Sequence, residues 1–342
     1  MSESKRSDDA LLRATPETVV WGAIPADRPP VLRIRSGQTV RIETVSQQPL
    51  NHEDPASFFA AAGIHADQVL PEASAIYREV KKSPPGGPHV LTGPIYVEGA
   101  EPGDMLEVRV LDVAFRVPYG VNAIGPGSGV LPELLSERVA PTIRLDLARN
   151  VALFANAEIP LAPFMGIMAV APPPARSPAS TKPPGEWGGN LDFRHLVAGA
   201  TLYLPVFNAG ALFYTGDGHA AQGDGEVDGA AIEISLAPLL QFAVHKRAGR
   251  SMKWPRAEDA AHDYVMGMDT DLDVALSEAV REAVEFLQRE RNLSAAQAYA
   301  LASFSVDFRV GEAVNLVKMV YGVIPKALFG TKAREELNAY RS

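Results

Sequence analysis

The stretch that decides the organisation of this chain reads Gly216-Asp217-Gly218-His219-Ala220-Ala221-Gln222-Gly223-Asp224-Gly225-Glu226-Val227-Asp228-Gly229. Small residues separate nearly all of its polar side chains, so the backbone can take positive φ angles and approach a ligand closely. The polar groups that bind metals or move protons are Asp217, His219, Gln222, Asp224 and Glu226. This composition predicts an active-site loop rather than an ordinary surface turn.

Two apolar segments enclose this loop. Residues 201–207 and 211–215 are strand-like on either side of an Asn208-Ala209-Gly210 turn, which predicts a hairpin that leads directly into the loop. Residues 231–236 then resume a strand. A loop between two strands is positioned by a rigid sheet, which is the arrangement that accurate chemistry requires.

Strand patterns dominate the N-terminal half. Residues 31–35 and 39–45 predict a second hairpin around Ser36-Gly37, and residues 93–98 and 105–113 predict a third around a Pro-Gly turn. Between them, Asp54, Pro55 and Gly63 are the start and stop signals of a short helix.

Helical patterns are concentrated in the C-terminal fifth of the chain. One predicted helix starts at Thr270 and Asp273, and a capping box at residues 294–297 opens another. The first helix repeats apolar residues at a spacing of three to four, namely Leu276, Val280, Ala283 and Leu287. We therefore expect a mainly β fold with α-helices, an α+β protein in which the C-terminal helices cover the sheet.

A proline-rich segment at residues 173–187 divides the sequence. Proline removes hydrogen-bond donors and fixes φ, so this loop or linker is expected to form neither a ladder nor a helix. It separates a β-rich half, residues 1–172, from residues 188–342, which hold the Gly-rich loop and the C-terminal helices. The halves are expected to form one catalytic unit, and the segment is either a connection or a lid.

Composition excludes several classes of function. The 342 residues carry a net charge of −9 and no Lys/Arg cluster, which argues against nucleic-acid or anionic-membrane partners and favours a small neutral partner. The chain has no cysteine, so disulfides, thiolate metal sites and cysteine nucleophiles are excluded. No signal-peptide pattern follows residues 1–9 and no run of about 18 apolar residues occurs, so a cytoplasmic location is expected. Phosphate-loop, dinucleotide, zincin and α/β-hydrolase motifs are also missing.

The loop favours a metal-assisted reaction. If residues 217–219 continue a strand, Asp217 and His219 project to the same side and form a carboxylate–imidazole pair for a divalent metal. His89, in another glycine- and proline-rich loop, is the best remote third ligand, and Glu226 or Asp224 would serve as general base. The alternative is structural: aspartates beside glycine form turns, and a single histidine such as His89 is often a core residue.

The chain resembles the acetamidase/formamidase family over nearly its whole length. The resemblance is carried by Ala14-Thr15-Pro16-Glu17-Thr18-Val19-Val20-Trp21-Gly22, by residues 91–104, by Pro163-Phe164-Met165-Gly166-Ile167, by Gly188-Gly189-Asn190-Leu191-Asp192, by Leu202-Tyr203-Leu204-Pro205-Val206 and by residues 210–226. It implies a β-sandwich or barrel core with C-terminal helices, and hydrolysis of a short-chain amide of the formamide or acetamide type to carboxylate and ammonia. It also implies a homo-oligomer.

The resemblance carries the loop residues over to this chain, with Asn190 and Asp192 as their neighbours. We expect Gln222, Asn190 and Asp192 to bind the amide. The donor set of histidine and carboxylates favours zinc, although calcium or manganese would also fit.

Two positions depart from the family pattern. Relatives carry His-Glu-Gly after Thr-Val-Ser, where this chain has Gln47-Gln48-Pro49, and they carry Gly-Val-His before an Ile, where this chain reads Met319-Val320-Tyr321-Gly322-Val323-Ile324. His52 is a possible replacement for the first missing histidine. These departures keep two alternatives open: a catalytically impaired homologue that binds a small amide, and a hydrolase of another C–N bond such as a lactam or carbamoyl group.

Overall fold

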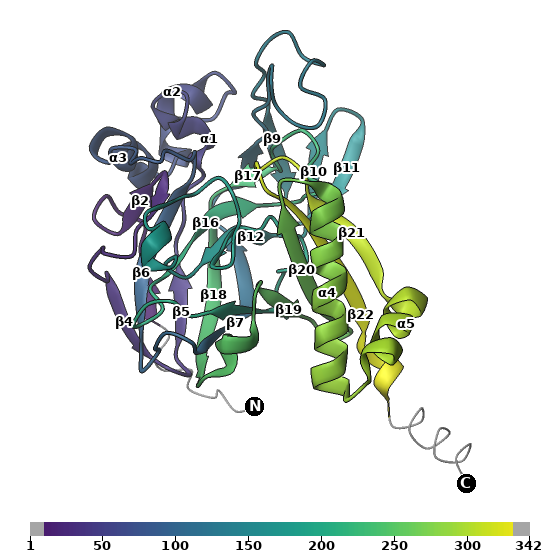
Figure 1. Ribbon diagram of the computed structural model, residues 1–342. Helices are drawn as coiled ribbons and strands as arrows, with labels where there is room; N and C mark the ends of the chain where they lie inside the picture. Colours follow the sequence, from purple (N-terminus) through teal and green to yellow (C-terminus); the bar gives the residue numbers. More distant parts are fainter. Residues whose placement is uncertain (1–9, 331–342) are drawn as a thin grey trace, which may run out of the picture.

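A computed structural model describes residues 10–330, which form two large β-sheets with helices at two sides (Figure 1). Residues 1–9 and 331–342, including the N-terminal residues considered above, lie outside the described part. The expected mainly β fold with α-helices is confirmed, and the sheets form a sandwich rather than a closed barrel.

The first sheet, called sheet A, has nine strands. In spatial order they are β1 (Ala10–Leu12), β5 (Thr39–Ile42), β18 (Leu236–His245), β7 (Met105–Phe115), β15 (Thr201–Pro205), β19 (Arg256–Glu258), β20 (His262–Asp269), β22 (Lys318–Pro325) and β21 (Asp307–Glu312). All of its pairs are antiparallel except β1 with β5.

The second sheet, called sheet B, has eleven strands. Its main path is β11 (Ala157–Pro160), β10 (Val151–Phe154), β9 (Thr142–Asp146), β8 (Tyr119–Val121), β17 (Glu233–Ile234), β16 (Phe213–His219), β12 (Phe164–Ala169) and β14 (Gly188–Asn190). Strand β6 (Val90–Glu98) also pairs with β16 and joins β2 (Val19–Trp21) and β4 (Leu32–Arg35) to the sheet.

The main core lies between the two sheets. Phe213 of sheet B packs edge-on against Phe242 of sheet A, with ring centroids 5.0 Å apart. Buried aliphatic residues from both sheets, such as Ile167 and Leu204, belong to the same apolar cluster. Burial of this surface removes apolar area from water at about 25 cal/mol per Å², which fixes the sheets relative to each other.

Helices cover the fold at two places (Figure 1). Near the N-terminus lie α1 (Gln47–Leu50), α2 (Pro55–Ala60) and α3 (Pro71–Glu79), and near the C-terminus lie α4 (Leu272–Arg291) and α5 (Ala295–Ser305). Short 3₁₀ turns occur at Ala66–Gln68, Pro174–Arg176, Ala248–Ser251 and Lys326–Phe329. Helix α4 packs on β20 and β22, so the prediction that a C-terminal helix covers the sheet is confirmed.

The helix ends follow the predicted caps in two cases. Asp54 caps α2 by accepting a hydrogen bond from the N–H of Ala56, and Ser294 with Gln297 forms the expected capping box of α5. The start of α4 differs, because Asp271 rather than Thr270 is its N-cap.

The buried side of α4 also differs from the prediction. Ala275, Ala279, Ala283 and Leu287 are buried, whereas Leu276 is exposed. Small residues are needed on this side because Gly267 of β20 lies against the helix backbone, where a Cβ atom would approach the carbonyl of Ala275 and the N–H of Ala279.

All three predicted hairpins are wrong in their pairing, although their strands exist. Strand β4 belongs to sheet B and β5 to sheet A, β6 belongs to sheet B and β7 to sheet A, and β15 belongs to sheet A and β16 to sheet B. Each turn therefore carries the chain across the sandwich. The same turn residues serve either connection, and burial of both strands in one core favours the crossing.

The proline-rich segment also differs from the expectation of no ladder and no helix. Strand β13 (Ala179–Ser180) pairs with β3 (Ala23–Ile24), and a 3₁₀ turn spans Pro174–Arg176. The ladder is short because prolines lie on both sides of it. The division into two halves at this segment remains a prediction.

Within residues 10–330, no helix combines the length and apolar character that a membrane span requires.

Candidate functional site

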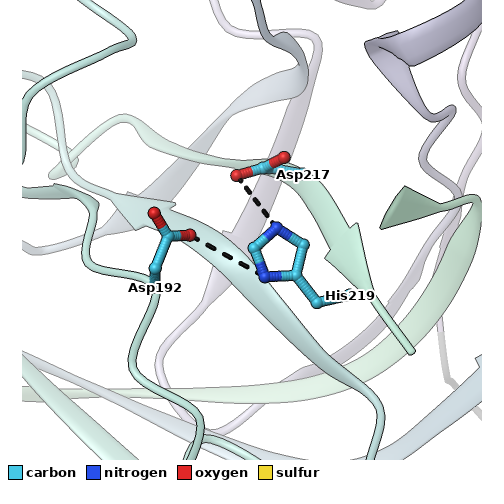
Figure 2. A group of neighbouring side chains, drawn as sticks. All are labelled: Asp192, Asp217 and His219. Carbon is cyan, nitrogen blue, oxygen red and sulfur yellow. Dashed lines mark ion pairs between the residues drawn. The ribbon is translucent and has the colours of Figure 1, made fainter. Parts of the chain in front are cut away.

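The Gly-rich loop brings Asp217 and His219 together at the end of β16, and Asp192 joins them from the segment after β14 (Figure 2). His219 Nε2 lies 3.4 Å from Asp217 Oδ2, and His219 Nδ1 lies 3.8 Å from Asp192 Oδ1. All three side chains are buried. The expected placement of Asp217 and His219 on one side is thus what the structure shows.

Gly166 of β12 leaves the space between these side chains open. A Cβ atom on Gly166 would contact Asp192 Oδ1 and would lie 2.7 Å from Asp217 Oδ2 and 2.8 Å from His219 Cε1. A Cβ atom does not approach non-bonded atoms this closely, so any larger residue would displace the site. The glycine creates a hollow that the three polar groups face.

The backbone at the site takes a conformation that is rare for residues other than glycine. Asp192, Asp217 and Glu226 have φ angles of 42°, 60° and 44°. Such left-handed conformations cost about 1–3 kcal/mol each and persist where surrounding structure holds them, often at functional positions. Three of them in one site indicate that side-chain placement is maintained at the expense of local stability.

Gln222 determines which nitrogen of His219 carries a proton. The Gln222 amide nitrogen donates to the carbonyl of Asp192 at 2.8 Å, so its Oε1 atom must face His219 Nδ1, also at 2.8 Å. An amide oxygen only accepts, so Nδ1 is the donor. Burial opposes the charge on His219, but the neighbouring carboxylates of Glu233 and Asp217 outweigh it and raise the pKa of His219 well above its ordinary value, so Nε2 also carries a proton when no cation is bound.

His219 Nε2 lies between two carboxylates and has no hydrogen-bond partner among the described residues. Asp217 Oδ2 and Glu233 Oε2 are each 3.4 Å away. The amide nitrogen of Gln47 bridges the same two carboxylates, donating to Asp217 at 2.5 Å and to Glu233 at 3.0 Å. A cation that displaces the Nε2 proton would find a buried imidazole nitrogen and two carboxylate oxygens, a donor set suited to a divalent metal.

The buried site contains more carboxyl groups than these. Ligand atoms lie within 4.8 Å of one another in three overlapping triads: Asp192–Asp217–His219, His219–Glu226–Glu233 and Asp192–Glu226–Glu312. We call these six residues the acidic cluster. Asn315 lies beside it and donates to Asp192 at 2.5 Å, while its backbone N–H donates to Glu312 at 2.9 Å.

The acidic cluster holds protons when no cation is bound. Burial raises the pKa of Asp192 to about 6, of Glu233 to about 7 and of Glu312 to about 8. Burial and the neighbouring Asp192 raise the pKa of Glu226 well above its ordinary value. The pKa of Asp217 is lowered because His89 and His219 outweigh the effect of burial. Neutralising such a cluster requires protons or a cation.

The acidic cluster therefore fits a divalent metal. His219 Nε2 and Asp192 Oδ1 have no hydrogen-bond partner within the described residues, and the hollow at Gly166 lies beside them. Imidazole nitrogen with carboxylate oxygens is a donor set found for zinc and manganese, and a preponderance of oxygen also suits calcium.

The other predicted site residues lie around the acidic cluster. His89 Nε2 is 3.7 Å from Asp217 Oδ2, but His89 belongs to none of the triads, and its Nδ1 faces the Thr181 hydroxyl at 3.1 Å. Burial lowers the pKa of His89. Asn190 is buried in β14 with its Oδ1 atom unpartnered among the described residues.

Asp224 lies apart from the triads and bonds to one of the departing positions. The Tyr321 hydroxyl donates to Asp224 Oδ2 at 2.9 Å and lies 3.1 Å from His195 Nε2. Gln47, the other departing position, contacts the acidic cluster itself. His52 does not replace a missing histidine, because it stacks on Phe58 near the surface with Arg138 beside it.

Glu233, Glu312 and Asn315 were not among the sequence candidates. Glu233 lies in an otherwise apolar strand, where alternation predicts that its side chain points to solvent. The one feature that marks Glu233 is its carboxylate in an apolar strand. Both faces of β17 are buried, and a charged side chain is rarely buried there unless it is paired or binds a ligand. Glu312 and Asn315 lie in a C-terminal segment without any recognisable motif.

The fold and the site define a β-sandwich protein with a buried histidine–carboxylate centre. The sequence profile of the Acetamidase/Formamidase family matches residues 64–177 and 173–331. The chain belongs to this family.

Individual relatives agree with this assignment. An acetamidase from Mycolicibacterium smegmatis is 30% identical over a region covering 41% of this chain and 49% of the relative. A formamidase from Methylophilus methylotrophus is 30% identical over 41% of this chain and 47% of the relative. The matched region thus spans about half the length of these curated relatives. The crystal structure of an acetamidase from Bacillus halodurans is 29% identical, with a TM-score of 0.77, and the match covers 93% of this chain and 98% of that one.

Proposed function

We propose that this protein hydrolyses a linear primary amide to a carboxylate and ammonia. The observation that carries the proposal is the unpartnered His219 Nε2, buried between Asp217 and Glu233 in a member of the Acetamidase/Formamidase family. The names of the relatives, acetamidase and formamidase, support a substrate of the formamide or acetamide type.

The proposal includes a divalent metal, with zinc favoured, that His219, Asp217 and Asp192 would hold, with Glu233 and Glu226 as further candidate ligands. When bound, such an ion polarises a carbonyl oxygen and lowers the pKa of a water molecule. His89 then serves as a neighbour of Asp217 rather than as a ligand, because it lies outside the triads.

Glu226 is the proposed proton carrier. It belongs to two of the triads, lines a cavity beside the loop, and has a pKa raised by burial and Asp192. A carboxyl group whose pKa lies above its ordinary value is more basic as a carboxylate, so it can accept a proton from water and give it to the departing nitrogen. Water adds to the carbonyl carbon, the C–N bond breaks, and the nitrogen leaves as ammonia. Asp224, which accepts a hydrogen bond from the Tyr321 hydroxyl, has a supporting role beside Glu226.

The sequence predicts that Gln222, Asn190 and Asp192 all bind the amide, but this proposal gives the three residues different roles. Both ends of the Gln222 amide are bonded within the protein, so Gln222 positions His219. Asn190 keeps an unpartnered Oδ1 atom that could accept a hydrogen bond from the amide N–H₂ group. Asp192 contributes to the cluster.

Gln47 favours a second candidate, a homologue that binds a small amide without turning it over. Its amide nitrogen lies between Asp217 and Glu233, at a position where the family resemblance implies histidine. An amide supplies no imidazole lone pair and does not carry protons. If that histidine is required for turnover, this chain binds substrate only.

The deciding experiment measures ammonia release from formamide, acetamide and propionamide, and ring opening of a γ-lactam to its amino acid, before and after chelation and after addition of single ions. Activity that disappears on chelation and returns with one ion supports the metal-assisted amidase. Activity indifferent to chelation contradicts the metal. Ring opening of the lactam alone points to cyclic amides, and binding of an amide without turnover supports the second candidate.

Assembly into a homo-oligomer also belongs to the proposal. Tyr299 and Phe304 on α5 are 64% and 80% exposed, an unusual exposure for aromatic side chains, which supports a subunit contact. Light scattering after gel filtration would test it. The cytoplasmic location expected from the sequence remains a prediction.

A further inference from the structure

A cavity of about 660 Å³ opens beside the acidic cluster. Volumes of about 300–1,000 Å³ are typical of sites that enclose drug-sized ligands, so this space is far larger than formamide or acetamide requires. Its polar end is formed by Gln222, Asp224 and Glu226 of the Gly-rich loop.

The opposite end of the cavity is apolar. Ile143 of β9, Phe154 of β10 and Ile159 of β11 line it, whereas Ile232, whose backbone is hydrogen-bonded to Ala220 and Ala221, lies at the loop. Polar and apolar groups are thus separated along the cavity. A ligand with a polar head and an apolar remainder would satisfy both ends.

The order of strands in sheet B sets the length of this apolar wall. From β16, which carries His219, the order runs through β17 and β8 to β9 and β10. Neighbouring strands lie about 4.8 Å apart, so β9 is about 14 Å from β16 along the sheet. An acyl group of two carbons whose amide is held beside His219 on β16 is too short to reach Ile143 or Phe154.

The charges around the cavity disfavour an acidic substrate. Arg194 is the one lysine or arginine that lines it, whereas the carboxyl groups of Asp224 and Asp228 line the same space together with Glu226, whose raised pKa favours its neutral form. A negatively charged acyl group would meet net repulsion there. The apolar end therefore suits an uncharged hydrocarbon chain or ring.

We propose that the substrate of this protein is a primary amide with an extended apolar acyl group, larger than acetamide, whose chain lies along β9 and β10. The inference rests on the proposed amide hydrolysis and specifies its substrate class. The amide group lies at the Gly-rich loop, and the hydrocarbon portion contacts Ile143, Phe154 and Ile159. Phe154 is 45% exposed and forms the rim of the cavity, where an incoming chain would cover it.

The first test compares kcat/KM for acetamide, butyramide and hexanamide. Burial of one methylene contributes about 0.8 kcal/mol, so each added methylene should raise kcat/KM about threefold to fourfold until the cavity is filled. Equal or falling kcat/KM from acetamide to hexanamide would overturn the proposal.

The second test uses neighbouring residues on one strand as variant and control. Phe154 and Leu153 of β10 are 45% and 46% exposed, but only Phe154 lines the cavity, because successive side chains of a strand point to opposite faces. Phe154→Ala should lower kcat/KM for hexanamide at least about fivefold relative to acetamide, since apolar contact area is lost. Leu153→Ala should leave the ratio unchanged.

Calorimetric binding of hexanamide and acetamide separates this inference from the proposed function. If no amide is hydrolysed but hexanamide binds more tightly than acetamide, and Phe154→Ala removes the difference, the catalytic proposal fails and the cavity assignment stands. If amides are hydrolysed but neither kcat/KM nor binding responds to chain length or to Phe154→Ala, the cavity assignment fails alone.

Discussion

Two groups of buried or half-buried carboxylates in this protein differ in how their charge is balanced. On sheet A, Lys326 Nζ lies 2.6 Å from Glu258 and 3.7 Å from Asp263, and Arg291 lies 3.0 Å from Asp263. We call these four residues the paired cluster. In the acidic cluster, no lysine or arginine forms an ion pair with any of the five carboxyl groups among residues 10–330.

The difference separates carboxylates that serve the fold from carboxylates that await a ligand. Protein side chains complete the paired cluster, so it gains nothing from a further cation. The acidic cluster keeps unpartnered atoms and raised pKa values, which are unfavourable for folding unless an ion enters. The predictions below test this contrast, beginning with the largest effect.

Replacement of His219 should have the largest effect, because the acidic cluster would then lose its ability to hold a metal. His219→Ala removes the nitrogen that lies 3.4 Å from both Asp217 and Glu233, so we expect metal affinity and amide turnover to fall more than about 100-fold, beyond the loss seen for outer-shell residues. Metal content and ammonia release measure this. His65→Ala, at an exposed position, is the matched control, and retained metal in His219→Ala would contradict the assignment.

Addition of the metal should stabilise the protein in a pH-dependent manner. An ion at 100 times its Kd contributes about 2.7 kcal/mol to the free energy of unfolding. Without the ion, burial raises the pKa of Asp192 from 3.8 to about 6 and that of Glu233 from 4.5 to about 7, so the folded state binds more protons than the unfolded chain. Stability of the metal-free protein therefore falls as pH rises through this window.

Protons on these carboxyl groups compete with the ion, so the rise in Tm on metal addition should be larger at pH 8 than at pH 6. Differential scanning fluorimetry with and without the ion measures the difference. A shift that is equal at both pH values, or that persists in His219→Ala, would place the ion elsewhere.

Replacement of Gln47 should have an intermediate effect on metal affinity. Gln47→Leu keeps the volume but removes the two hydrogen bonds to Asp217 and Glu233, so metal affinity should fall about 10-fold to 100-fold, as for other residues that orient ligands. Gln48→Leu, on the same helix but without contact to these carboxylates, should bind metal normally. Unchanged affinity in Gln47→Leu would show that Gln47 only fills space.

The paired cluster should show the smallest effect. Lys326→Met breaks its 2.6 Å contact with the partly exposed Glu258 and a longer contact with the buried Asp263, which stays paired with Arg291, so the free energy of unfolding should fall by less than about 1 kcal/mol. Urea unfolding measures this. Metal content and turnover should stay at wild-type levels, and a loss of either would remove the distinction between the two clusters.

Sequence reasoning predicted the strands of this fold better than their pairing. The turns at Ser36-Gly37, Pro102-Gly103 and Asn208–Gly210 do reverse the chain, but each leads to the opposite sheet. Turn residues specify a local change of direction, whereas the partner of a strand depends on apolar contacts with residues far along the chain. No local pattern distinguishes the two outcomes.

The site was predictable where its residues lie on one loop. Asp217, His219 and Glu226 share a Gly-rich stretch, and the structure brings all three into the acidic cluster. Glu233 and Glu312 join them only through strand pairing and a bridge between Gly225 and Glu312, which the sequence does not reveal. The role of Gln222 depends on a hydrogen bond to the carbonyl of Asp192, again a contact between distant segments.

The crossings between sheets have a consequence for biosynthesis. Strand β18 lies between β5 and β7 in sheet A, and β16 and β17 lie between β12 and β8 in sheet B. Strands β5, β7, β8 and β12 therefore leave the ribosome before the strands that pair with them in the folded protein. Their partners are complete only when residues 213–245 have been translated. At about 5–20 residues per second, more than a hundred residues of nascent chain carry unpaired strand edges for several seconds or longer, an interval in which chaperones would have to shield them.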